Sequence, residues 1–508
     1  MERAGPRAGA SAADRPRNAE RFVARFGHEF KWTEGEGWLY WDGKRWSRDA
    51  ANGKLLKASH VTMRAIQNEA DAVRASGDDF IVKEPKSGPA VFWSDVIAKW
   101  GRDSESNSRM SKLREHAAPD CEVDVQALDA DPYKINVLNG TLVLNKDTDG
   151  EYIKLRPHDP ADLITHLAPV EYDPLAACPA YDRFLERVMP KEENRRFLHQ
   201  WGGLSLTGDV SEQILAFFYG TGKNGKSTLL NAWARVMGDY GKSIDISTFL
   251  NESRTRAGGQ PTPDLARLTG VRFLRTSEPE KGAKLAEGLV KLATGGEPML
   301  VRHLNQPFFE FLPQFKLTIS GNYKPVIQGA DEGIWRRVRL IPWLVQIPEA
   351  ERDKHLGVKL ERETQGIFNR LLDGLRDWAD EGLVEPEEVT EATRAYREES
   401  DPLGRFLSAC VDPSPGERVQ SSVMFETFKA WGKVNDGPEW SNKGFSAAMS
   451  DRGFAKKQSD VIWWLNVRLK RRADDFVDIH GNPRPASVID EIVGDDPAGR
   501  RIDLPILP

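Results

Sequence analysis

Apolar runs of strand length alternate with segments of helical period between about residues 210 and 345. The strongest run, residues 214–219, is hydrophobic throughout, and a glycine-rich stretch follows it before a helical pattern begins near Thr228. Residues 271–277 and 315–320 predict two further strands. Alternation of this kind predicts an α/β domain built on a doubly wound sheet.

The residues before this domain combine hairpin and helix patterns. Residues 38–49 alternate aromatic and polar residues around an Asp-Gly pair and predict a β-hairpin. Residues 135–145 predict a second hairpin, with its turn at Asn139-Gly140. We expect the tryptophan rings of the first hairpin to lie in a core rather than to form a base-stacking surface. Helical periods are expected at residues 61–73, 91–100 and 180–209.

Charged helices are predicted after the α/β domain, over residues 347–400. They carry an apolar stripe made of Leu371, Leu372, Leu375 and Trp378. The pairs Asp401-Pro402 and Asp412-Pro413 interrupt the helical period and predict a linker.

A small terminal domain is predicted over residues 415–472, with two helices and a two-stranded wing. Trp463 and Trp464 are adjacent on the second strand of the wing, so at most one of them should face the core. The tail after Ala473 is rich in proline and aspartate and is expected to be loose. The domain carries a basic set made of Lys443, Lys456, Lys457, Arg468, Lys470, Arg471 and Arg472.

Composition narrows these possibilities only a little. A chain of 508 residues has room for about three domains at roughly 150 residues each. The net charge of -6 means that any nucleic-acid surface must be local. The three cysteines, Cys121, Cys178 and Cys410, are far apart and predict neither a zinc site nor a disulfide framework, which favours a reducing compartment. No apolar stretch approaches ~18 residues, so no transmembrane helix is expected.

The glycine-rich stretch fits the phosphate-loop pattern GxxxxGK[ST] without a mismatch. It lies between an apolar run and a helical pattern, as that loop does, and glycines let backbone N–H groups approach phosphate oxygens. Lys226 would reach the β- and γ-phosphates of ATP, and Ser227 would bind Mg²⁺. The alternative is an ordinary glycine-rich turn with a surface lysine. The nucleotide-binding candidates are Gly220, Thr221, Gly222, Lys223, Asn224, Gly225, Lys226, Ser227 and Thr228.

Further candidates lie at the ends of the later strands. Glu278 and Glu280 follow the run 271–277 and could hold Mg²⁺ and polarise water, or they could be solvated acids at a strand end. Asn322 follows the run 315–320 and could orient that water or contact the γ-phosphate, or it could be a turn residue.

Arg336 and Arg337 precede an apolar run near residue 340. Either arginine could act as a finger that neutralises charge in a neighbouring subunit's site. Both could instead be surface charges on an edge strand. The pattern alone leaves the two possibilities open.

The order of these pieces resembles the superfamily 3 helicases, in particular the helicase part of phage and plasmid primase-helicases and of their poxvirus relatives. The matching stretches are FFYGTGKNGKSTLL, RTSEPEKGAKLAEGLVKLATGGEPMLVRHLNQPFFEF, FKLTISGNYKP and DEGIWRRVRLIPW, within residues 200–345. The resemblance implies that Lys226 and Ser227 are the Walker A residues, with Glu278 and Glu280 at the Walker B position. It also makes Asn322 the sensor and places Arg336 and Arg337 at the arginine finger.

The same resemblance implies a DNA-binding hairpin. Lys291, Arg302, His303 and Lys316 lie in or beside the segment LVRHLNQPFFEF, which corresponds to the hairpin that enters the central channel of such rings. Cations there would bind DNA phosphates without reading sequence. The alternative is a solvated hairpin with scattered charges. The wing of the terminal domain implies a winged helix, whose basic set would bind duplex phosphates or, alternatively, form a subunit-packing face.

The sequence therefore predicts an α/β, AAA+-like P-loop ATPase core with an N-terminal α+β module and a C-terminal winged-helix domain. The expected parts are a disordered lead at 1–17, the module at 18–200, the ATPase domain at 201–400, the winged helix at 401–475 and a tail at 476–508. No polymerase-type primase domain is evident, so primer synthesis is not expected.

The predicted function is an ATP- and Mg²⁺-dependent replicative DNA helicase of a phage or plasmid-like element. It would form a ring, expected to be a homo-hexamer, that moves on single-stranded and forked DNA, and the resemblance implies movement from 3′ to 5′. The expected location is the cytoplasm of a bacterial host, beside a separate primase or polymerase and without a membrane partner. The alternatives are a P-loop ATPase that remodels protein complexes and a nucleotide-regulated DNA-binding scaffold. Stimulation of hydrolysis by single-stranded DNA distinguishes the first alternative, and nucleotide bound without cleavage identifies the second.

Overall fold

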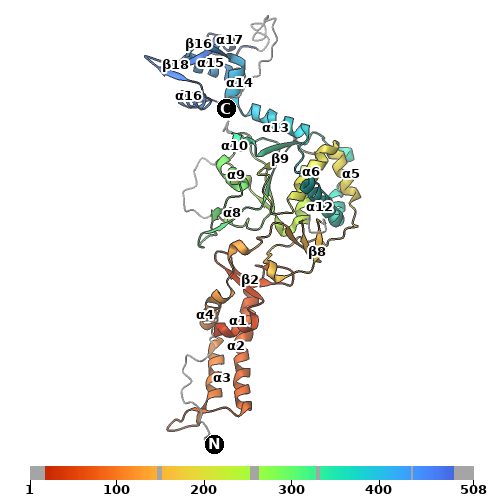
Figure 1. Cartoon of the computed structure of the whole chain (residues 1–508), viewed down its shortest axis with the longest axis vertical. Helices are drawn as coiled ribbons and strands as arrows, with labels where there is room; N and C mark the ends of the chain where they lie inside the picture. The colour runs from red at the N-terminus through yellow and green to blue at the C-terminus, as the bar shows by residue number, and fades with distance from the viewer. Residues whose placement is uncertain are drawn as a thin grey trace. The chain divides into compact units, whose positions relative to one another are not determined.

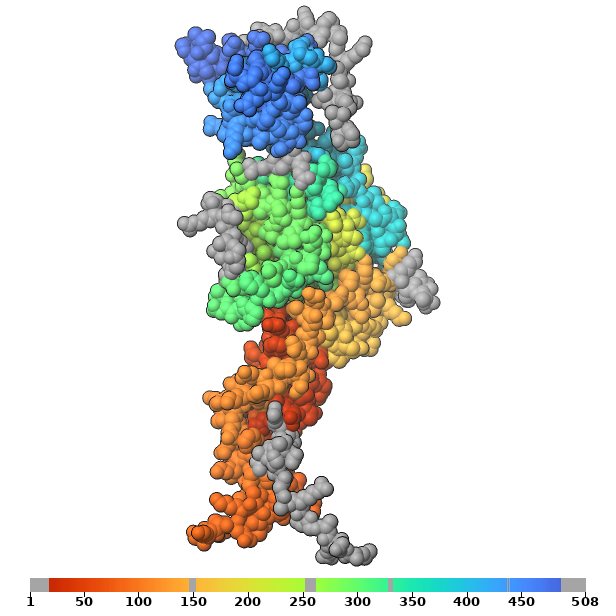
Figure 2. Space-filling view, turned by 60° about the vertical axis from the view of Figure 1, so that its left-hand side comes forward, coloured from red at the N-terminus to blue at the C-terminus, as the bar shows by residue number. Residues whose placement is uncertain are grey.

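The structure is a computed structural model that describes residues 18–145, 152–251, 262–327, 332–435, 437 and 439–485. The chain divides into two compact units, residues 1–325 with 332–390, and residues 326–331 with 391–508. In Figure 2 the first unit runs from red through green to cyan and the second is mainly blue. The predicted lead at 1–17 lies outside the described residues, as does the tail from residue 486 onward.

The core of the first unit is a parallel sheet of five strands (Figure 1). In spatial order its strands are β10 (Gly241–Ile244), β11 (Phe273–Thr276), β14 (Lys316–Gly321), β9 (Leu215–Tyr219) and β15 (Val338–Pro342). All four pairings are parallel. The strands β9 and β14 are almost completely buried, which explains why the sequence shows continuous apolar runs there. The prediction of an α/β domain with a parallel sheet is confirmed.

Helices pack around this sheet, and two of them cross at very short range. The helices are α5 (Pro179–Val188), α6 (Glu192–Leu204), α7 (Lys226–Met237), α8 (Pro263–Ala266), α9 (Glu287–Thr294), α10 (Glu332–Trp335), α11 (Leu356–Arg362), α12 (Thr364–Glu381) and α13 (Glu387–Glu399), the last of which continues into the second unit. A Cβ added to Gly203 of α6 would lie 2.4 Å from the Leu371 carbonyl oxygen, and one added to Gly374 of α12 would lie 2.0 Å from the His199 carbonyl oxygen. Glycine is therefore required at both positions. The predicted apolar stripe faces this contact, because Leu371, Leu372 and Leu375 are buried.

The N-terminal part of the first unit contains the two predicted hairpins. Its helices are α1 (Asn18–Phe26), α2 (Ala51–Ser76), α3 (Trp93–Ser104) and α4 (Asn107–Ala117). Its strands are β1 (Phe30–Thr33), β2 (Gly37–Trp41), β3 (Trp46–Ser47), β4 (Ile81–Lys83), β5 (Val91–Phe92), β6 (Lys134–Val137), β7 (Gly140–Val143) and β8 (Lys154–Arg156). Trp41 pairs with Trp46 across the first hairpin, as predicted, and Trp46 is buried. In the second hairpin Val137 pairs with Gly140, so the turn lies at 138–139, one residue before the predicted position.

A further hairpin lies between β11 and β14 in the sequence. It consists of β12 (Met299–Val301) and β13 (Phe309–Phe311), which are antiparallel, with Val301 opposite Phe309. This is the strand–turn–strand predicted from LVRHLNQPFFEF. Met299, Val301, Phe309 and Phe311 are buried, whereas Leu300 and Glu310 are exposed, so the hairpin has one face against the protein and one face outward.

The second unit combines helices with an antiparallel sheet in the order β16-β18-β17. Its elements are α14 (Pro402–Cys410), β16 (Val411–Gln420), α15 (Ser421–Val434), α16 (Asn442–Asp451), β17 (Lys456–Gln458), β18 (Ile462–Leu469) and α17 (Ala473–Phe476). Trp464 is fully buried and Trp463 is only partly buried, which confirms that one of the pair faces the core.

Two expectations about this unit were wrong. The Asp-Pro pairs do not mark a linker, because Asp401 caps α14 by accepting a hydrogen bond from the Gly404 N–H at 2.8 Å, and the second pair lies inside β16. Proline is compatible with the first turn of a helix and with an edge strand, so the first pair begins a new helix after α13 and the second lies within a strand. The residues just after Ala473 are also not loose, because they form α17 and bury Phe476.

Two absences hold across the described residues. No helix there is long and apolar enough to cross a membrane. The same residues contain no group of three or more histidine, cysteine, aspartate or glutamate side chains placed to hold a metal ion.

Candidate nucleotide site

The glycine-rich loop joins β9 to α7 in a conformation that only its sequence permits. Gly222 and Gly225 adopt positive φ angles of 88° and 89°, which glycine adopts at little cost. Gly220 has no room for a side chain, since an added Cβ would lie 2.4 Å from the carbonyl oxygen of Trp343. A Cβ on Gly225 would lie 2.9 Å from atoms of Phe184 on α5. The loop is therefore shaped by its own backbone and enclosed by neighbouring elements.

The chain after β15 supports this loop from the side. The Ile347 N–H donates to the Lys223 carbonyl oxygen at 2.9 Å, and the Asn224 side-chain amide donates to the Trp343 carbonyl oxygen at 3.2 Å. Lys223 itself has a φ of 54°, which is unusual for a residue with a side chain. These contacts hold the loop in place without a ligand.

Lys226 begins α7 and is buried, with 5% of its surface exposed. Its Nζ donates to the Gly220 carbonyl oxygen at 2.5 Å, to Asn224 Oδ1 at 3.2 Å and to Asn322 Oδ1 at 3.4 Å. Burial lowers the pKa of Lys226, and the negative charge of Glu278 opposes that change. An ammonium held by neutral oxygens in this way can exchange them for phosphate oxygens.

A cavity of about 510 Å³ lies beside this lysine, at the carboxyl ends of the parallel strands. Open α/β sheets bind ligands at this edge. Glu278 Oε1 accepts a hydrogen bond from the Asn322 backbone N–H at 2.6 Å, so the ends of β11 and β14 are joined at the cavity. The predicted residues that line it are Gly222, Lys223, Asn224, Gly225, Lys226, Ser227, Thr228, Glu278 and Asn322.

Three predicted residues lie outside this lining. Gly220 supports the loop from beneath, as described above. Thr221 is exposed and accepts a hydrogen bond from the Gln346 side-chain amide at 2.7 Å. Glu280 is exposed and does not line the cavity, so of the two acids only Glu278 lies at it.

The residues at the cavity fit a magnesium ion. Ser227 and Glu278 place a hydroxyl and a carboxylate on the same cavity, and both are oxygen ligands of the kind that Mg²⁺ prefers. Mg²⁺ usually takes only one or two protein ligands and completes its shell with water and phosphate. The small number of protein ligands therefore agrees with this ion.

The two predicted arginine fingers differ in their surroundings. Arg336 is exposed, and its Nη2 lies 3.4 Å from Gln213 Oε1. Arg337 is buried, and its guanidinium donates to Thr294 Oγ1 at 3.1 Å and to the Gly333 carbonyl oxygen at 2.6 Å. The expectation that Arg337 reaches a neighbouring subunit is wrong, because its donors are directed into its own chain.

Lys316 was also wrongly predicted to contact DNA. It is the first residue of β14 and is 3% exposed. Its Nζ donates to the carbonyl oxygens of Thr207, of Asp209 at 3.0 Å and of Gln314 at 3.0 Å. Burial and the positive charge of Arg272 lower its pKa well below the usual value. This lysine joins parts of the core.

The remaining predicted DNA-binding residues lie on or near the hairpin β12–β13. Lys291 is partly buried on α9. The Arg302 guanidinium lies over the Phe308 ring at 4.6 Å from its centre. His303 stacks on Phe309 with 5.8 Å between ring centres.

The turn between β1 and β2 contacts this hairpin. Glu36 in that turn has a side chain that is 3% exposed and pairs with Arg48 at 2.9 Å. Its carboxylate also lies 3.6 Å from His303 Nε2. A Cβ on Gly35 would lie 2.8 Å from the Phe309 ring, so the turn and the hairpin are in close contact. His303 therefore faces the N-terminal part of the chain.

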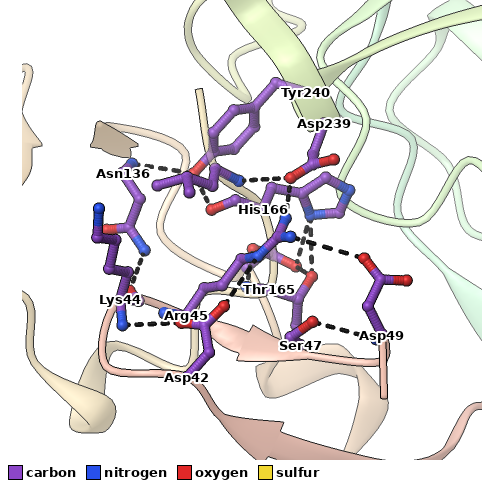
Figure 3. Close-up of polar contacts among 12 residues, drawn as sticks. Asp42, Lys44, Arg45, Ser47, Asp49, Asn136, Thr165, His166, Asp239 and Tyr240 are labelled. Atoms are coloured by element: carbon purple, nitrogen blue, oxygen red, sulfur yellow. Dashed lines mark hydrogen bonds and ion pairs between the residues drawn. The ribbon is translucent and has the colours of Figure 1, made fainter. Parts of the chain in front are cut away.

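A second contact joins the N-terminal part to the far end of α7 (Figure 3). Arg45, in the turn between β2 and β3, forms an ion pair with Asp239, which follows α7 directly. The Asp42 carboxylate shapes that turn by accepting hydrogen bonds from the backbone N–H groups of Lys44 and Arg45, both at 2.9 Å. Asp239 also accepts a hydrogen bond from the Leu167 N–H at 3.2 Å. The helix that begins at the phosphate loop thus ends against the first hairpin.

Buried polar groups continue this contact, as Figure 3 also shows. The Tyr240 hydroxyl accepts a hydrogen bond from the Asn136 N–H at 3.0 Å and donates to the His166 carbonyl oxygen at 3.2 Å. Asp129 accepts hydrogen bonds from Thr165, and its Oδ2 lies 3.3 Å from His166 Nδ1. Sequence patterns did not indicate these residues, because they come from several segments far apart in the sequence and have no local signature.

Arg275, which lies in β11 and lines the cavity, was not among the predicted residues. Its charge within a predicted strand was the signal that could have identified it.

Comparisons with known proteins agree with the helicase resemblance. Residues 19–190 match the family model described as "D5 N terminal like". The chain is 29% identical over 422 residues to a predicted helicase, L207/L206, of Acanthamoeba polyphaga mimivirus, which covers 78% of this chain and 43% of that protein. It is 27% identical over 270 residues to a predicted helicase, 022R, of Frog virus 3, and the match covers 50% of this chain and 28% of that protein. It is 25% identical over 334 residues to a predicted primase, C962R, of African swine fever virus, and the match covers 61% of this chain and 34% of that protein.

The chain spans less than half the length of these relatives. They come from viruses of eukaryotes and give no support to the expected bacterial host. Among solved structures, the NrS-1 C terminal region aligns with a TM-score of 0.34 at 14% identity, over 54% of this chain and 59% of that one. A score this low supports no conclusion about this protein. The sequence relationships confirm the predicted resemblance to primase-helicases. The chain is a homologue of viral predicted helicases and primases, with a D5 N terminal like region at residues 19–190.

Proposed function

We propose that this protein is an ATP-hydrolysing DNA helicase whose nucleotide site is the cavity beside Lys226. The observation that supports this most strongly is the convergence of Lys226, Ser227 and Glu278 on one cavity at the carboxyl edge of a parallel sheet. Glu278 comes from a separate segment that follows β11, so its meeting with Lys226 and Ser227 is not a consequence of the phosphate-loop pattern alone. Relationship to viral predicted helicases supports the same activity.

Each residue at the cavity has a separate role in the proposed hydrolysis. Lys226 binds the terminal phosphates once they replace the oxygens of Gly220, Asn224 and Asn322 around its Nζ. Glu278 orients and polarises the attacking water, and its hydrogen bond from the Asn322 N–H fixes its direction. The Asn322 side chain then contacts the γ-phosphate or that water. Mg²⁺ bound at Ser227 and Glu278 would supply charge neutralisation to the phosphates.

The fold and the assembly extend this proposal. In this proposal the core is an AAA+-like ATPase and the second unit is a winged helix, an assignment that the order helix, strand, two helices and two strands supports. The protein works as a ring, expected to be a homo-hexamer, in which Arg336 is the arginine finger offered to the neighbouring site. Its exposure supports that role.

DNA contact is proposed for the hairpin β12–β13 and for the winged helix. Lys443, Lys456 and Lys457 are exposed in the second unit and suit phosphate binding. Arg302 and Lys291 remain candidates near the hairpin. A forked DNA substrate, a separate primase or polymerase partner, and an origin in a phage or plasmid-like element stay predictions.

A strand-displacement assay on a forked duplex tests the proposal. The purified chain is expected to unwind the fork with ATP and Mg²⁺ when a 3′ single-stranded tail is present, and Lys226→Met should be inactive. Hydrolysis that single-stranded DNA does not stimulate would favour a protein-remodelling ATPase. Nucleotide that is bound and never cleaved in a single-turnover experiment would favour a scaffold.

A further inference from the structure

Arg275 is a charged residue in the middle of the sheet, beside the nucleotide cavity. It lies in β11 between Ser243 of β10 and Thr318 of β14. Phe273, two residues earlier and so on the same face of the strand, packs edge-on against Trp233 of α7 with 6.1 Å between ring centres. The Arg275 side chain is therefore on the α7 side of the sheet, and it lines the same cavity as Ser227 and Glu278.

The charge of this arginine is not balanced by an acid. Its Nη1 donates to Asn231 Oδ1 on α7, and Asn231 is neutral. Burial lowers the pKa of Arg275, and no carboxylate of the described residues counteracts that effect. Placing a cation partly out of water without a negative partner is unfavourable. An anion entering the cavity would remove this imbalance.

Other arginines of the first unit show how the chain balances such groups elsewhere. Arg272, which is buried, donates to the carbonyl oxygens of Leu206 and Lys134, both at 2.7 Å. Arg339 is paired with the carboxylate of Glu385. Arg275 has one neutral partner, and its Nε and Nη2 have no hydrogen-bond acceptor among the described residues. Those donors are the ones left for a ligand in the cavity.

We propose that Arg275 binds the phosphate chain of the nucleotide, as a second cation contributed by the same subunit. The inference rests on the proposed nucleotide site and adds a ligand-binding residue to it. Lys226 supplies one positive charge from the loop, and Arg275 supplies another from β11, and both line the same cavity as Ser227. A guanidinium offers two parallel N–H groups to a phosphate, which a lysine cannot do.

A purely structural role is the alternative, in which Arg275 only ties β11 to α7 through Asn231. The two roles differ in what the partner residue does. If the hydrogen bond is what matters, removing Asn231 and removing the arginine should have the same effect. If the charge is what matters, removing Asn231 leaves the phosphate contact available and should have little effect on phosphate binding.

Calorimetric titration of the full chain with tripolyphosphate and with ADP, in the presence of Mg²⁺, tests the proposal. Arg275→Gln keeps a donor for Asn231 and should weaken tripolyphosphate binding about tenfold or more, the size expected for a lost charge-assisted contact. Arg275→Lys keeps the charge but not the paired N–H groups, so its affinity should fall between those of the wild type and Arg275→Gln. Asn231→Ala should stay within about threefold of the wild type. Arg275→Met serves as the second neutral variant, with thermal unfolding to confirm that each protein is folded.

The outcomes separate this inference from the proposed function. Wild-type affinity in both neutral arginine variants, together with loss of binding in Lys226→Met, would overturn the role of Arg275 while leaving the nucleotide site intact. An equal loss in Asn231→Ala and Arg275→Gln would show that the contact is structural and would also overturn it. Wild-type protein that binds neither tripolyphosphate nor ADP would refute the nucleotide site itself, and the role of Arg275 with it.

Discussion

The ion pair between Arg45 and Asp239 should couple the first hairpin to the end of α7, and replacing either partner measures that coupling. The Arg45 side chain is 16% exposed and that of Asp239 is 39% exposed, so the pair is partly shielded from water. Arg45→Gln leaves the Asp239 carboxylate with the Leu167 N–H as its remaining neighbour at 3.2 Å. In Asp239→Asn, Arg45 keeps Asp42 at 3.5 Å and Asp49 at 3.7 Å, but neither acid belongs to the end of α7, so neither replaces the lost contact.

The size of the effect follows from this partial burial. Two unit charges ~4 Å apart attract each other by about 4 kcal/mol at the effective dielectric constant near a protein surface, before desolvation and side-chain ordering are subtracted. Fully exposed pairs retain only about 0.2–1 kcal/mol. We therefore expect each single substitution to cost about 1–2 kcal/mol and the double-mutant cycle to give a coupling of about 1 kcal/mol.

Amide hydrogen exchange is the suitable measurement, because a chain with two compact units need not unfold in one step. Peptides that cover residues 37–47 and 226–240 should exchange about 5- to 30-fold faster in Arg45→Gln, which corresponds to about 1–2 kcal/mol. Lys44→Gln is the matched control, since it changes the same charge in the same turn and Lys44 has no side-chain partner among the described residues. Faster exchange confined to residues 37–47, or strictly additive effects of Arg45→Gln and Asp239→Asn, would refute the coupling.

Three further predictions test other parts of the structure. Lys226→Met should abolish phosphate release. It should change the unfolding free energy by less than about 1 kcal/mol, because it removes a buried cation together with its hydrogen bonds. Hydrolysis at the wild-type rate would contradict this prediction. Gly374→Ala should lower stability by about 1–3 kcal/mol in thermal unfolding, because its Cβ would lie 2.0 Å from the His199 carbonyl oxygen. Gly357→Ala, where nothing lies within 4 Å, should be neutral or stabilising, and equal effects at both glycines would exclude steric overlap as the cause. For Asp129, burial tends to raise the pKa, but the charge of His166 and hydrogen bonds from His166 and Thr165 outweigh it and lower the pKa. A carboxyl with a depressed pKa stabilises the fold above its unfolded pKa of about 3.9 and loses that contribution as the pH falls towards the folded value. In urea unfolding, the free energy of unfolding should therefore fall more steeply from pH 7 to pH 3 in the wild type than in Asp129→Asn. Parallel pH dependence in the two proteins would contradict the lowered pKa of Asp129.

The sequence predicted the elements whose signals are local. The apolar runs gave β9, β11 and β14 within one or two residues, since a buried parallel strand needs apolar residues on both faces. The phosphate loop was equally clear because glycines are required at 222 and 225 by their positive φ angles. The turn of the second hairpin was predicted one residue late, because Asn-Gly is favoured at a two-residue turn and here Gly140 instead pairs within the ladder.

Burial of single polar side chains was not predictable in the same way. Lys316 and Arg337 both looked like exposed cations beside strands. Lys316 instead donates to the carbonyl oxygens of Thr207 and Asp209 in a distant segment, and Arg337 donates to the nearby Gly333 carbonyl oxygen and to the distant Thr294 hydroxyl. Every residue has a backbone carbonyl oxygen, so a pattern of residue types cannot show which of these oxygens needs a side-chain donor. Arg275 was missed for the opposite reason, because its importance depends on the absence of an acid around it in space.

The sheet topology also limits what Arg336 can do. It lies just before β15, whose first residue, Val338, pairs with Leu215, so it lies near the amino ends of the parallel strands. Lys226, Glu278 and Asn322 lie at the carboxyl ends. The five residue steps from Lys316 to Gly321 in β14 separate the two edges by roughly 17 Å at about 3.3 Å per residue. An arginine side chain cannot span that distance, so Arg336 cannot serve the site of its own chain. If it acts in hydrolysis at all, it must act on a neighbour, and mixing wild-type with Arg336→Ala chains should then lower the rate of phosphate release by more than the fraction of variant added. A loss in simple proportion to that fraction would remove the arginine from the mechanism.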